Sequence, residues 1–370
     1  MGSQAVFRWI GKDAPGVIGD FDAWGGDAPT AVFERSGGDE WRSSLELRQD
    51  AYIEYSFVRD GKRIPDPLNP RRTPNGMGAT NQFFTMPDWS ESSLTRRRRT
   101  VPRGVVSAHL LDNVTLLAGG HRRVWLYQPP VERPCRLLVV LDGQDYLRRG
   151  RLVTIVDNLI ASGRIEPLVI AMVAHGGQAR VIEYASNDAT ATFIVKHVVP
   201  FSRRHANVAE AQSGGQGYGI LGASMGGLMA LHVGLMYPEV ISCVYSQSGA
   251  FRLGSLYGRS LLDALIPHLP ISPIRVFIEV GFYEGLRGPN RDLYAVLQNR
   301  GYDVEFGEHS GGHNWMSWRN RVADGLETLF PGPATTRKYV SPQREVALSR
   351  HNSSPPADRT KSNEDDVGPI

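Results

Sequence analysis

The chain has 370 residues, of which 41% are hydrophobic and 21% are charged, a composition that is ordinary for a globular protein and a length that can hold two domains. Its formal net charge of +3 is too small to indicate a nucleic-acid partner. No apolar run approaches the roughly 18 residues that a membrane-spanning helix needs, so we expect no partner membrane either.

The cysteines and the first residues of the chain bear on its compartment. Cys135 and Cys243 lie in or beside apolar segments and do not form a C-x-x-C pair, so we expect two buried free thiols. Free thiols suit a reducing compartment. Residues 1–9 lack a basic region followed by an apolar core, so no signal peptide is expected and we assign the protein to the cytoplasm.

Residues 1–88 are predicted to form an all-β domain. Short apolar segments are separated by turns rich in Gly, Asp and Pro, and this spacing is typical of a small sandwich. Trp24 and Trp41 fall in this region, and we expect them to pack in the core or against the neighbouring domain rather than to stack on a sugar. The predicted strands are 6–10, 31–33, 44–47 and 52–58.

Two polar segments are expected to lie outside the packed domains. Residues 89–103 contain Pro, Ser and the basic run Arg96–Arg99, and they are predicted to be an interdomain linker with solvated arginines. Residues 333–370 are rich in Pro, Ser, Arg and Asp and have few large apolar side chains, which predicts a disordered tail.

From residue 104 to residue 332, predicted strands alternate with predicted helices, which is the pattern of a mostly parallel sheet covered by helices. The order of these elements is that of an α/β-hydrolase domain. The predicted fold class is therefore α/β, with a small all-β domain in front of the hydrolase domain. Strands are expected at 123–127, 136–141, 168–173, 240–245 and 275–280, and helices at 152–160, around 293–297 and in a last segment that ends near residue 330.

The segment 218–232 carries the clearest chemical signal. It predicts a short apolar strand, a tight turn with the sequence Gly-Ala-Ser-Met-Gly at 222–226, and an apolar helix. Small residues two before and two after Ser224 let the chain turn sharply, so that the hydroxyl is exposed at a helix N-terminus. We therefore predict that Ser224 is a nucleophile and that the backbone amide of Met225 faces the developing oxyanion.

A serine hydroxyl needs a base within hydrogen-bond reach, and in this fold the histidine follows the serine and the acid in the chain. His313 is our candidate, because two glycines precede it and Asn-Trp follows it, so a loop can bring the ring to the serine while the next helix anchors it. His309 is the alternative base. The two histidines have the spacing of a helical metal site, but the glycines between them disfavour a helix, so no metal and no other cofactor is expected.

The acid should lie just past the strand that ends near residue 280, where a carboxylate can hold the tautomer of the imidazole. Glu284 stands at that point and is the candidate. Asp292 in the following helix and Glu279 within the strand are alternatives, and a Ser-His dyad without an acid also fits.

The second oxyanion donor should come from the loop after an early central strand. The sequence Leu-Asp-Gly-Gln-Asp-Tyr at 141–146 supplies it, with the amide of Gln144 as the candidate and Gly143 allowing close approach of the substrate. Asp142 and Asp145 can instead be turn residues alone.

These pieces together resemble the enterochelin (ferric-enterobactin) esterase family of the esterase D-like α/β hydrolases. The resemblance covers residues 5–332, including an N-terminal domain similar to the immunoglobulin-like, glycogen-binding-module-like domain of that family. It implies a serine esterase that hydrolyses the ester bonds of a siderophore lactone so that iron is released in the cell. The segments that carry it are 19–24, 55–61, 66–70, 141–146, 180–184, 222–227, 281–284 and 311–319.

The resemblance also implies a cationic side chain near the serine, and Arg180 matches that position, unless it pairs with Glu183 or another carboxylate. Trp315, in the aromatic stretch after His313, is a further candidate for substrate binding. That stretch also fits related enzymes that cleave feruloyl or acetyl esters on polysaccharides. A carbohydrate-binding protein with a degenerate hydrolase domain is the non-catalytic alternative.

Overall fold

The computed structural model of the chain describes residues 2–25, 31–76, 78–112, 114–211, 217–252 and 261–335. Residues 1–334 pack as one compact unit. The boundaries expected between sandwich, linker and hydrolase domain within this unit remain a prediction. The predicted disordered tail lies outside the described residues, apart from residues 333–335.

Two small antiparallel sheets make up the N-terminal part. One has the strand order β1-β4-β3, and the other has the order β2-β5-β8-β7 with β6 paired to β5. Side chains of both sheets share one core, in which Phe7, Tyr55 and Phe57 meet edge to face. The strands are β1 (Gly2–Ile10), β2 (Gly16–Gly19), β3 (Glu34–Gly37), β4 (Glu40–Arg48), β5 (Tyr52–Arg59), β6 (Lys62–Ile64), β7 (Arg72–Pro74) and β8 (Thr80–Thr85), with the short 3-10 helix η1 (Asp20–Asp22) after β2.

One of the predicted strands in this part is wrong. Residues 31–33 are not in a strand, and β3 begins only at Glu34. Ala31 is buried in the sandwich core and Phe33 packs against the same core, so the apolar pair fills space without making a ladder. The indole N–H groups of both tryptophans donate hydrogen bonds inside the protein. Trp24 donates to the carboxylate of Asp20, and Trp41 donates to the carbonyl oxygen of residue 11.

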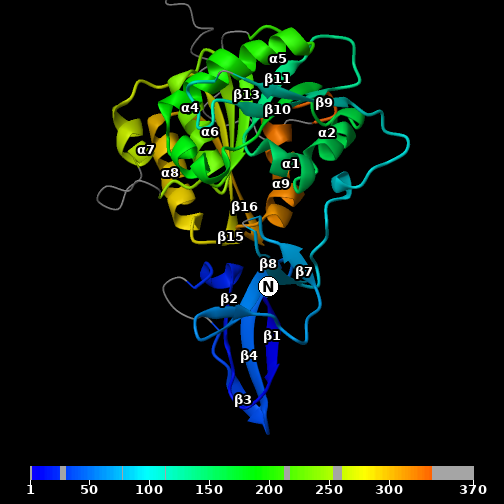
Figure 1. The fold of residues 1–370 in the computed structure, drawn as a ribbon, viewed down its shortest axis with the longest axis vertical. Coiled ribbons are helices and arrows are strands. Elements are labelled where there is room, and N and C mark those ends of the chain that lie inside the picture. The colour runs from blue at the N-terminus through cyan, green and yellow to red at the C-terminus, as the bar shows by residue number, and fades with distance from the viewer. Residues whose placement is uncertain are drawn as a thin grey trace, which may run out of the picture. The chain divides into compact units, whose positions relative to one another are not determined.

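The larger part is built on an eight-stranded sheet with the order β16-β15-β14-β13-β11-β12-β10-β9 (Figure 1). The pairs from β12 to β16 are parallel, whereas β10 runs antiparallel to both β9 and β12. The first and last of these strands were not predicted from the sequence. The strands are β9 (Val105–Leu111), β10 (Arg122–Gln128), β11 (Arg136–Val140), β12 (Leu168–Val173), β13 (Tyr218–Ala223), β14 (Ile241–Gln247), β15 (Arg275–Tyr283) and β16 (Asp303–Gly312).

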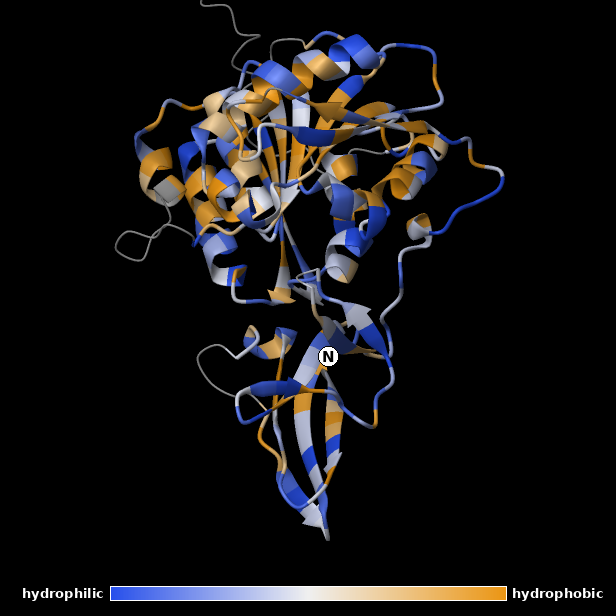
Figure 2. Cartoon of the chain, in the orientation of Figure 1, coloured by the Kyte–Doolittle hydropathy of each residue, from blue (hydrophilic) through white to orange (hydrophobic). Residues whose placement is uncertain are grey.

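Helices cover both faces of this sheet because consecutive residues of its buried strands point to opposite sides. In β11, Leu137 and Val139 belong to the core beneath α6 and α8, and Leu138 and Val140 to the core beneath α2 and α9. Figure 2 shows apolar residues concentrated in these strands and on the helices beside them. The helices are η2 (Ser93–Thr95), α1 (Gly143–Arg148), α2 (Leu152–Ala161), η3 (Gly177–Ala179), α3 (Arg180–Tyr184), α4 (Asp188–Phe193), the π-helical η4 (Ile194–Val198), α5 (Val199–His205), α6 (Met225–Met236), α7 (Leu261–Leu265), η5 (Ile266–His268), α8 (Arg287–Arg300) and α9 (Trp315–Leu329).

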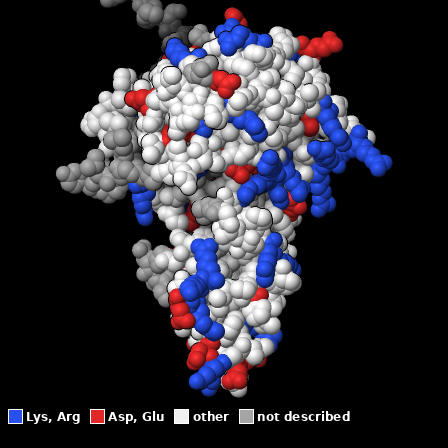
Figure 3. All heavy atoms as spheres, in the orientation of Figure 1, with Lys and Arg blue, Asp and Glu red and all other residues white. Residues whose placement is uncertain are grey.

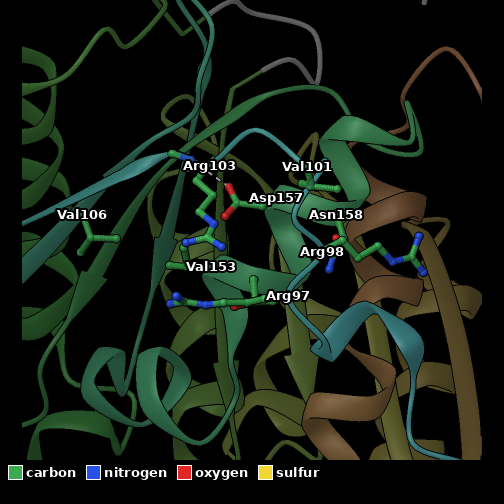
Figure 4. Close-up of a pocket in the computed structure, with 10 residues that line it drawn as sticks. Arg97, Arg98, Val101, Arg103, Val106, Val153, Asp157 and Asn158 are labelled. Carbon is green, nitrogen blue, oxygen red and sulfur yellow. Dashed lines mark hydrogen bonds between the residues drawn. The ribbon is translucent and has the colours of Figure 1, made fainter.

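The segment between the two parts is fastened to α2. Asn158 donates hydrogen bonds from Nδ2 to the carbonyl oxygens of Leu94 and Arg96, and Asp157 accepts one from the amide of Gly104. A small pocket of about 130 Å³ lies at this junction, and Figure 4 shows the arginines of the basic run that line it. Figure 3 shows basic and acidic side chains interspersed on one face of the molecule, which agrees with the small net charge.

The two cysteines agree with the sequence-based expectation. Cys135 and Cys243 are both buried and free. In the part of the chain that the structure describes, no helix combines the length and the apolar character needed to span a bilayer. The carboxyl ends of the parallel strands β11 and β13–β16 meet at one edge of the large sheet, where a binding site is expected in a sheet of this kind.

Candidate active site

Ser224 stands at the sharp turn between β13 and α6. Its backbone is held at φ 58° and ψ −122°, a strained conformation that is characteristic of a nucleophile elbow. Gly222 is needed for this turn, because a Cβ atom on it would lie 2.2 Å from the carbonyl oxygen of Gly226. The Ser224 amide donates to the carbonyl oxygen of Gln247 in the neighbouring strand, which fixes the turn to the sheet.

Three residues that are far apart in the chain form a continuous hydrogen-bonded array. Nε2 of His313 lies 3.0 Å from Oγ of Ser224, and Nδ1 of the same ring lies 2.6 Å from Oε2 of Glu284. Glu284 directly follows β15, and His313 directly follows β16, so two adjacent parallel strands deliver the acid and the base to the same edge. The sequence-predicted serine, histidine and first-choice acid are thus brought together.

Glu284 is held in one orientation by both of its oxygens. Oε2 faces His313, while Oε1 accepts hydrogen bonds from Oγ of Ser248 at 2.7 Å and from the amide of Gly281. Burial raises the pKa of the Glu284 carboxyl, but the charge of His313 and these hydrogen bonds outweigh that effect and leave the pKa below its usual value. The group is therefore suited to remain a carboxylate beside the imidazole.

The alternative acids occupy different surroundings. Glu279 is buried inside β15, where it accepts a hydrogen bond from Nε2 of Gln247 and burial raises its pKa to about 8. Asp292 lies on the exposed face of α8. Neither carboxylate contacts His313 in the described structure, and Glu284 does.

The alternative base, His309, lies in β16 and not in a helix, as the glycines after it predicted. Its side chain is buried, and burial lowers its pKa to about 4. The described part of the chain contains no group of three or more His, Cys, Asp or Glu side chains arranged to hold a metal ion.

The loop after β11 lies beside the nucleophile elbow. The amide of Leu141 donates to the carbonyl oxygen of Leu221, and a Cβ atom on Gly226 would lie 3.0 Å from Oδ2 of Asp142. Gln144 and Met225 each fall in the first turn of a helix, where backbone amides have no acceptor within the helix. Both predicted oxyanion donors are thus N-terminal helix amides that border the same loop and elbow.

Gly143 has a packing role in this loop. A Cβ atom at this position would lie 2.3 Å from the carbonyl carbon of Met172 in β12, so only glycine lets α1 lie this close to the sheet. The side chain of Gln144 is also used, because its Oε1 accepts a hydrogen bond from the amide of His175.

Arg180 is engaged by a carboxylate. Its Nε and Nη2 atoms lie 2.6 and 2.7 Å from the two oxygens of Asp142, a bidentate pair, and the guanidinium stacks on the ring of Tyr184. Glu183, the partner considered from the sequence, pairs instead with Arg122. Since Asp142 belongs to the loop after β11, Arg180 braces that loop.

Trp315, the first residue of α9, is packed between other aromatic rings. Its centroid lies 5.1 Å from that of Tyr146 and 5.0 Å from that of Trp318. Trp318 in turn meets the ring of His313 edge to face at 4.9 Å. Trp315 therefore supports the histidine through a second aromatic ring.

A pocket of about 350 Å³ opens beside the array, and residues of both parts of the chain form its wall. Ala23 and Trp24 come from the segment after β2, whereas Glu284, Leu286 and His313 come from the carboxyl edge of the large sheet. Arg252 also lines the pocket, and the guanidinium of Arg63 lies 4.5 Å from the ring of Trp24. The pocket thus combines an aromatic wall with exposed positive charge.

Ser248 and Asp20, like Arg252, were missed by the sequence analysis. Ser248 follows β14 and links Glu284 to Nε1 of Trp318, and its position at the carboxyl end of a parallel strand was a usable signal. Asp20 bonds to Asn314 beside the histidine, although the two are 294 residues apart, and no local pattern indicates such a contact.

The fold and a family match define the class of the protein. Residues 117–273 match the family model described as a putative esterase. The chain is a carboxylic ester hydrolase with the α/β-hydrolase fold, preceded by a β domain.

Within this class, the chain is similar to enterobactin esterases over most of its length, which confirms the resemblance inferred from the sequence. It is 25% identical to the iron(III) enterobactin esterase of Dickeya dadantii over 82% of this chain and 80% of that protein. The crystal structure of ferric enterobactin esterase from Salmonella typhimurium superposes with a TM-score of 0.72 at 22% identity, covering 88% of this chain and 93% of that one. A ferulic acid esterase from Anaeromyces mucronatus shares the fold at a TM-score of 0.54 and 15% identity, over 65% of this chain and 95% of its own.

Proposed function

We propose that this protein is a serine esterase that hydrolyses the ester bonds of a siderophore lactone of the enterobactin type. The observation that carries the proposal is the array in which His313 bridges Oγ of Ser224 and the carboxylate of Glu284. The similarity to iron(III) enterobactin esterases across both parts of the chain supports the substrate class.

In this mechanism, Ser224 attacks the ester carbonyl carbon while Nε2 of neutral His313 takes the hydroxyl proton. Glu284 holds the Nδ1–H tautomer and stabilises the imidazolium that forms. The oxyanion receives hydrogen bonds from the amides of Met225 and Gln144. Collapse of the intermediate releases the alcohol, which takes the proton from His313, and water then hydrolyses the acyl-enzyme in the same way.

The pocket supports an anionic aromatic substrate. A ferric complex of a catecholate lactone carries several negative charges, and the exposed guanidinium of Arg252 can attract it while the ring of Trp24 offers an apolar face. Arg180 has a different part in the proposal, because its charge is already paired with Asp142. We assign Arg252 to substrate binding and Arg180 to bracing the loop that carries the oxyanion donor.

Comparing Arg252→Gln with Arg180→Gln separates these roles. Arg252→Gln should raise KM for ferric enterobactin roughly tenfold and leave p-nitrophenyl butyrate hydrolysis unchanged, because only the anionic substrate loses a charge-assisted contact. The increase in KM for ferric enterobactin caused by Arg252→Gln should become smaller as salt rises from about 0.05 to 0.5 M. Arg180→Gln should lower kcat for both substrates alike, because it leaves the buried carboxylate of Asp142 unpaired. A selective loss of the anionic substrate in Arg180→Gln, with Arg252→Gln unaffected, would reverse the assignment.

A substrate panel tests the proposal as a whole. The purified protein should open ferric enterobactin, with one acid group released per bond and the cyclic ester lost on chromatography, faster than it cleaves feruloyl arabinose or acetylated xylan. The Ser224→Ala variant is the matched blank. Preference for the feruloyl or acetylated sugars would establish the polysaccharide-esterase alternative instead.

The proposal includes the setting of the reaction. Hydrolysis of a ferric siderophore inside the cytoplasm would make its iron available there, and the two buried free thiols suit a reducing compartment. The partner required is the small-molecule ester alone, with neither nucleic acid nor a membrane.

A further inference from the structure

Asp20 belongs to the N-terminal sandwich, and its side chain contacts the catalytic edge of the large sheet. It is the first residue of η1, directly after β2, and only 1% of its surface is exposed. Its Oδ1 accepts a hydrogen bond from Nε1 of Trp24, and its Oδ2 accepts one from the amide of Glu54 at 2.8 Å. These bonds fix the carboxylate to the sandwich.

The same carboxylate holds the residue that follows His313. Nδ2 of Asn314 donates to Oδ2 of Asp20 at 3.0 Å, while Oδ1 of Asn314 accepts from the amide of Ser317 and caps α9. The Asn314 side chain is therefore bonded at both ends, to the sandwich and to the helix. Its orientation depends on Asp20 because no other described group accepts from Nδ2.

Asp20 also packs against the residue that precedes His313. A Cβ atom on Gly312 would lie 2.0 Å from Cγ of Asp20, so the backbone of β16 ends directly against the carboxyl group. The amide of Asn314 donates to the carbonyl oxygen of Gly312, which closes a tight turn around the histidine. Both neighbours of His313, Gly312 and Asn314, thus contact the side chain of Asp20 in the sandwich.

We propose that Asp20 is a positioning residue that sets the placement of His313, so that the N-terminal sandwich completes the catalytic site. This inference rests on the proposed function for its kinetic consequence. A shift of the turn by about 1 Å would lengthen the His313 contacts with Ser224 and Glu284, and misplacement of that size can cost about 100-fold in rate. The pocket residues Ala23 and Trp24 lie just past Asp20, so binding and positioning come from the same segment.

The test compares Asp20→Ala with Asp20→Asn and with Asp66→Ala in the full chain. Asp66 is also a buried sandwich carboxylate, but it bonds to Oη of Tyr55 and the amide of Leu68, away from the histidine turn. Asp20→Ala should lower kcat for p-nitrophenyl butyrate by about 10- to 100-fold with KM within about twofold. Asp20→Asn keeps an oxygen that can accept from Asn314 and should retain at least about a third of kcat.

A second measurement does not depend on activity. Amide hydrogen exchange over residues 312–318 should accelerate in Asp20→Ala and stay at the wild-type rate in Asp66→Ala. Loss of kcat that is equal in Asp20→Ala and Asp66→Ala, or unchanged exchange in Asp20→Ala, would overturn the inference. If the wild-type protein hydrolysed none of the esters, the proposed function would be refuted. The hydrogen-exchange comparison would still decide whether Asp20 fixes the turn around His313.

Discussion

Replacement of Ser224 by alanine is expected to reduce kcat for ferric enterobactin and for p-nitrophenyl butyrate by about 10⁴- to 10⁶-fold. The hydroxyl is the only group in the array that can form the acyl-enzyme, and the remaining oxyanion donors and pocket supply only the residual rate. Initial rates over a range of substrate concentrations measure the loss. Labelling by a fluorophosphonate should disappear at the same time, because the reagent phosphonylates the activated serine.

Ser202→Ala is a matched control for this substitution. Ser202 is fully buried in α5, and its hydroxyl donates to the carbonyl oxygen of Val198 in the preceding turn. This variant should keep wild-type labelling and activity at a temperature where it is folded. Retention of more than about a tenth of wild-type activity by Ser224→Ala would show that another group is the nucleophile.

The parts of the site that could be predicted are those in which a residue type that the chemistry needs stands in a recognisable local backbone pattern. A strand-turn-helix pattern with glycines at 222 and 226 determines where Ser224 stands without reference to the rest of the chain. Glu284 could be located because it follows a predicted parallel strand of the sheet, and such strands end at a common edge. Strand β16 was not predicted from the sequence. His313 was chosen because of the two glycines before it, which form the end of that strand.

Contacts between distant segments could not be predicted in the same way. The sequence offered Glu183 as a local partner for Arg180, whereas the folded chain supplies Asp142, 38 residues earlier, on a neighbouring loop. Asp20 lies in a sandwich whose likeness to sugar-binding modules drew attention to its tryptophans. Its actual contact depends on how that sandwich packs against β16, which no spacing along the chain encodes.

The edges of elements were also harder to locate than their centres. Residues 31–33 are apolar enough for a strand, yet β3 starts afterwards at Glu34. Ala31 and Phe33 pack in the sandwich core, whereas the side chain of Val32 is exposed. Three residues are too few to show whether an apolar segment joins a ladder, whereas alternation over a longer segment does show it. In β4, by contrast, Leu45 and Leu47 alternate with exposed residues, and that strand was recognised.

Removal of His313 should be nearly as damaging as removal of the serine, and removal of His309 should not. His313→Ala deletes the acceptor of the Ser224 proton, so kcat should fall by about 10³- to 10⁶-fold, whereas His309→Ala should stay within about tenfold of wild type. In the wild type, kcat/KM should decrease toward acid pH as the base becomes protonated, because only a neutral imidazole accepts the proton. His309 cannot produce this limb near neutral pH, since burial lowers its pKa to about 4 and it is already neutral there. The acid limb should accordingly persist in His309→Ala. Equal and mild losses in the two variants, or disappearance of the limb in His309→Ala, would transfer the role of base away from His313.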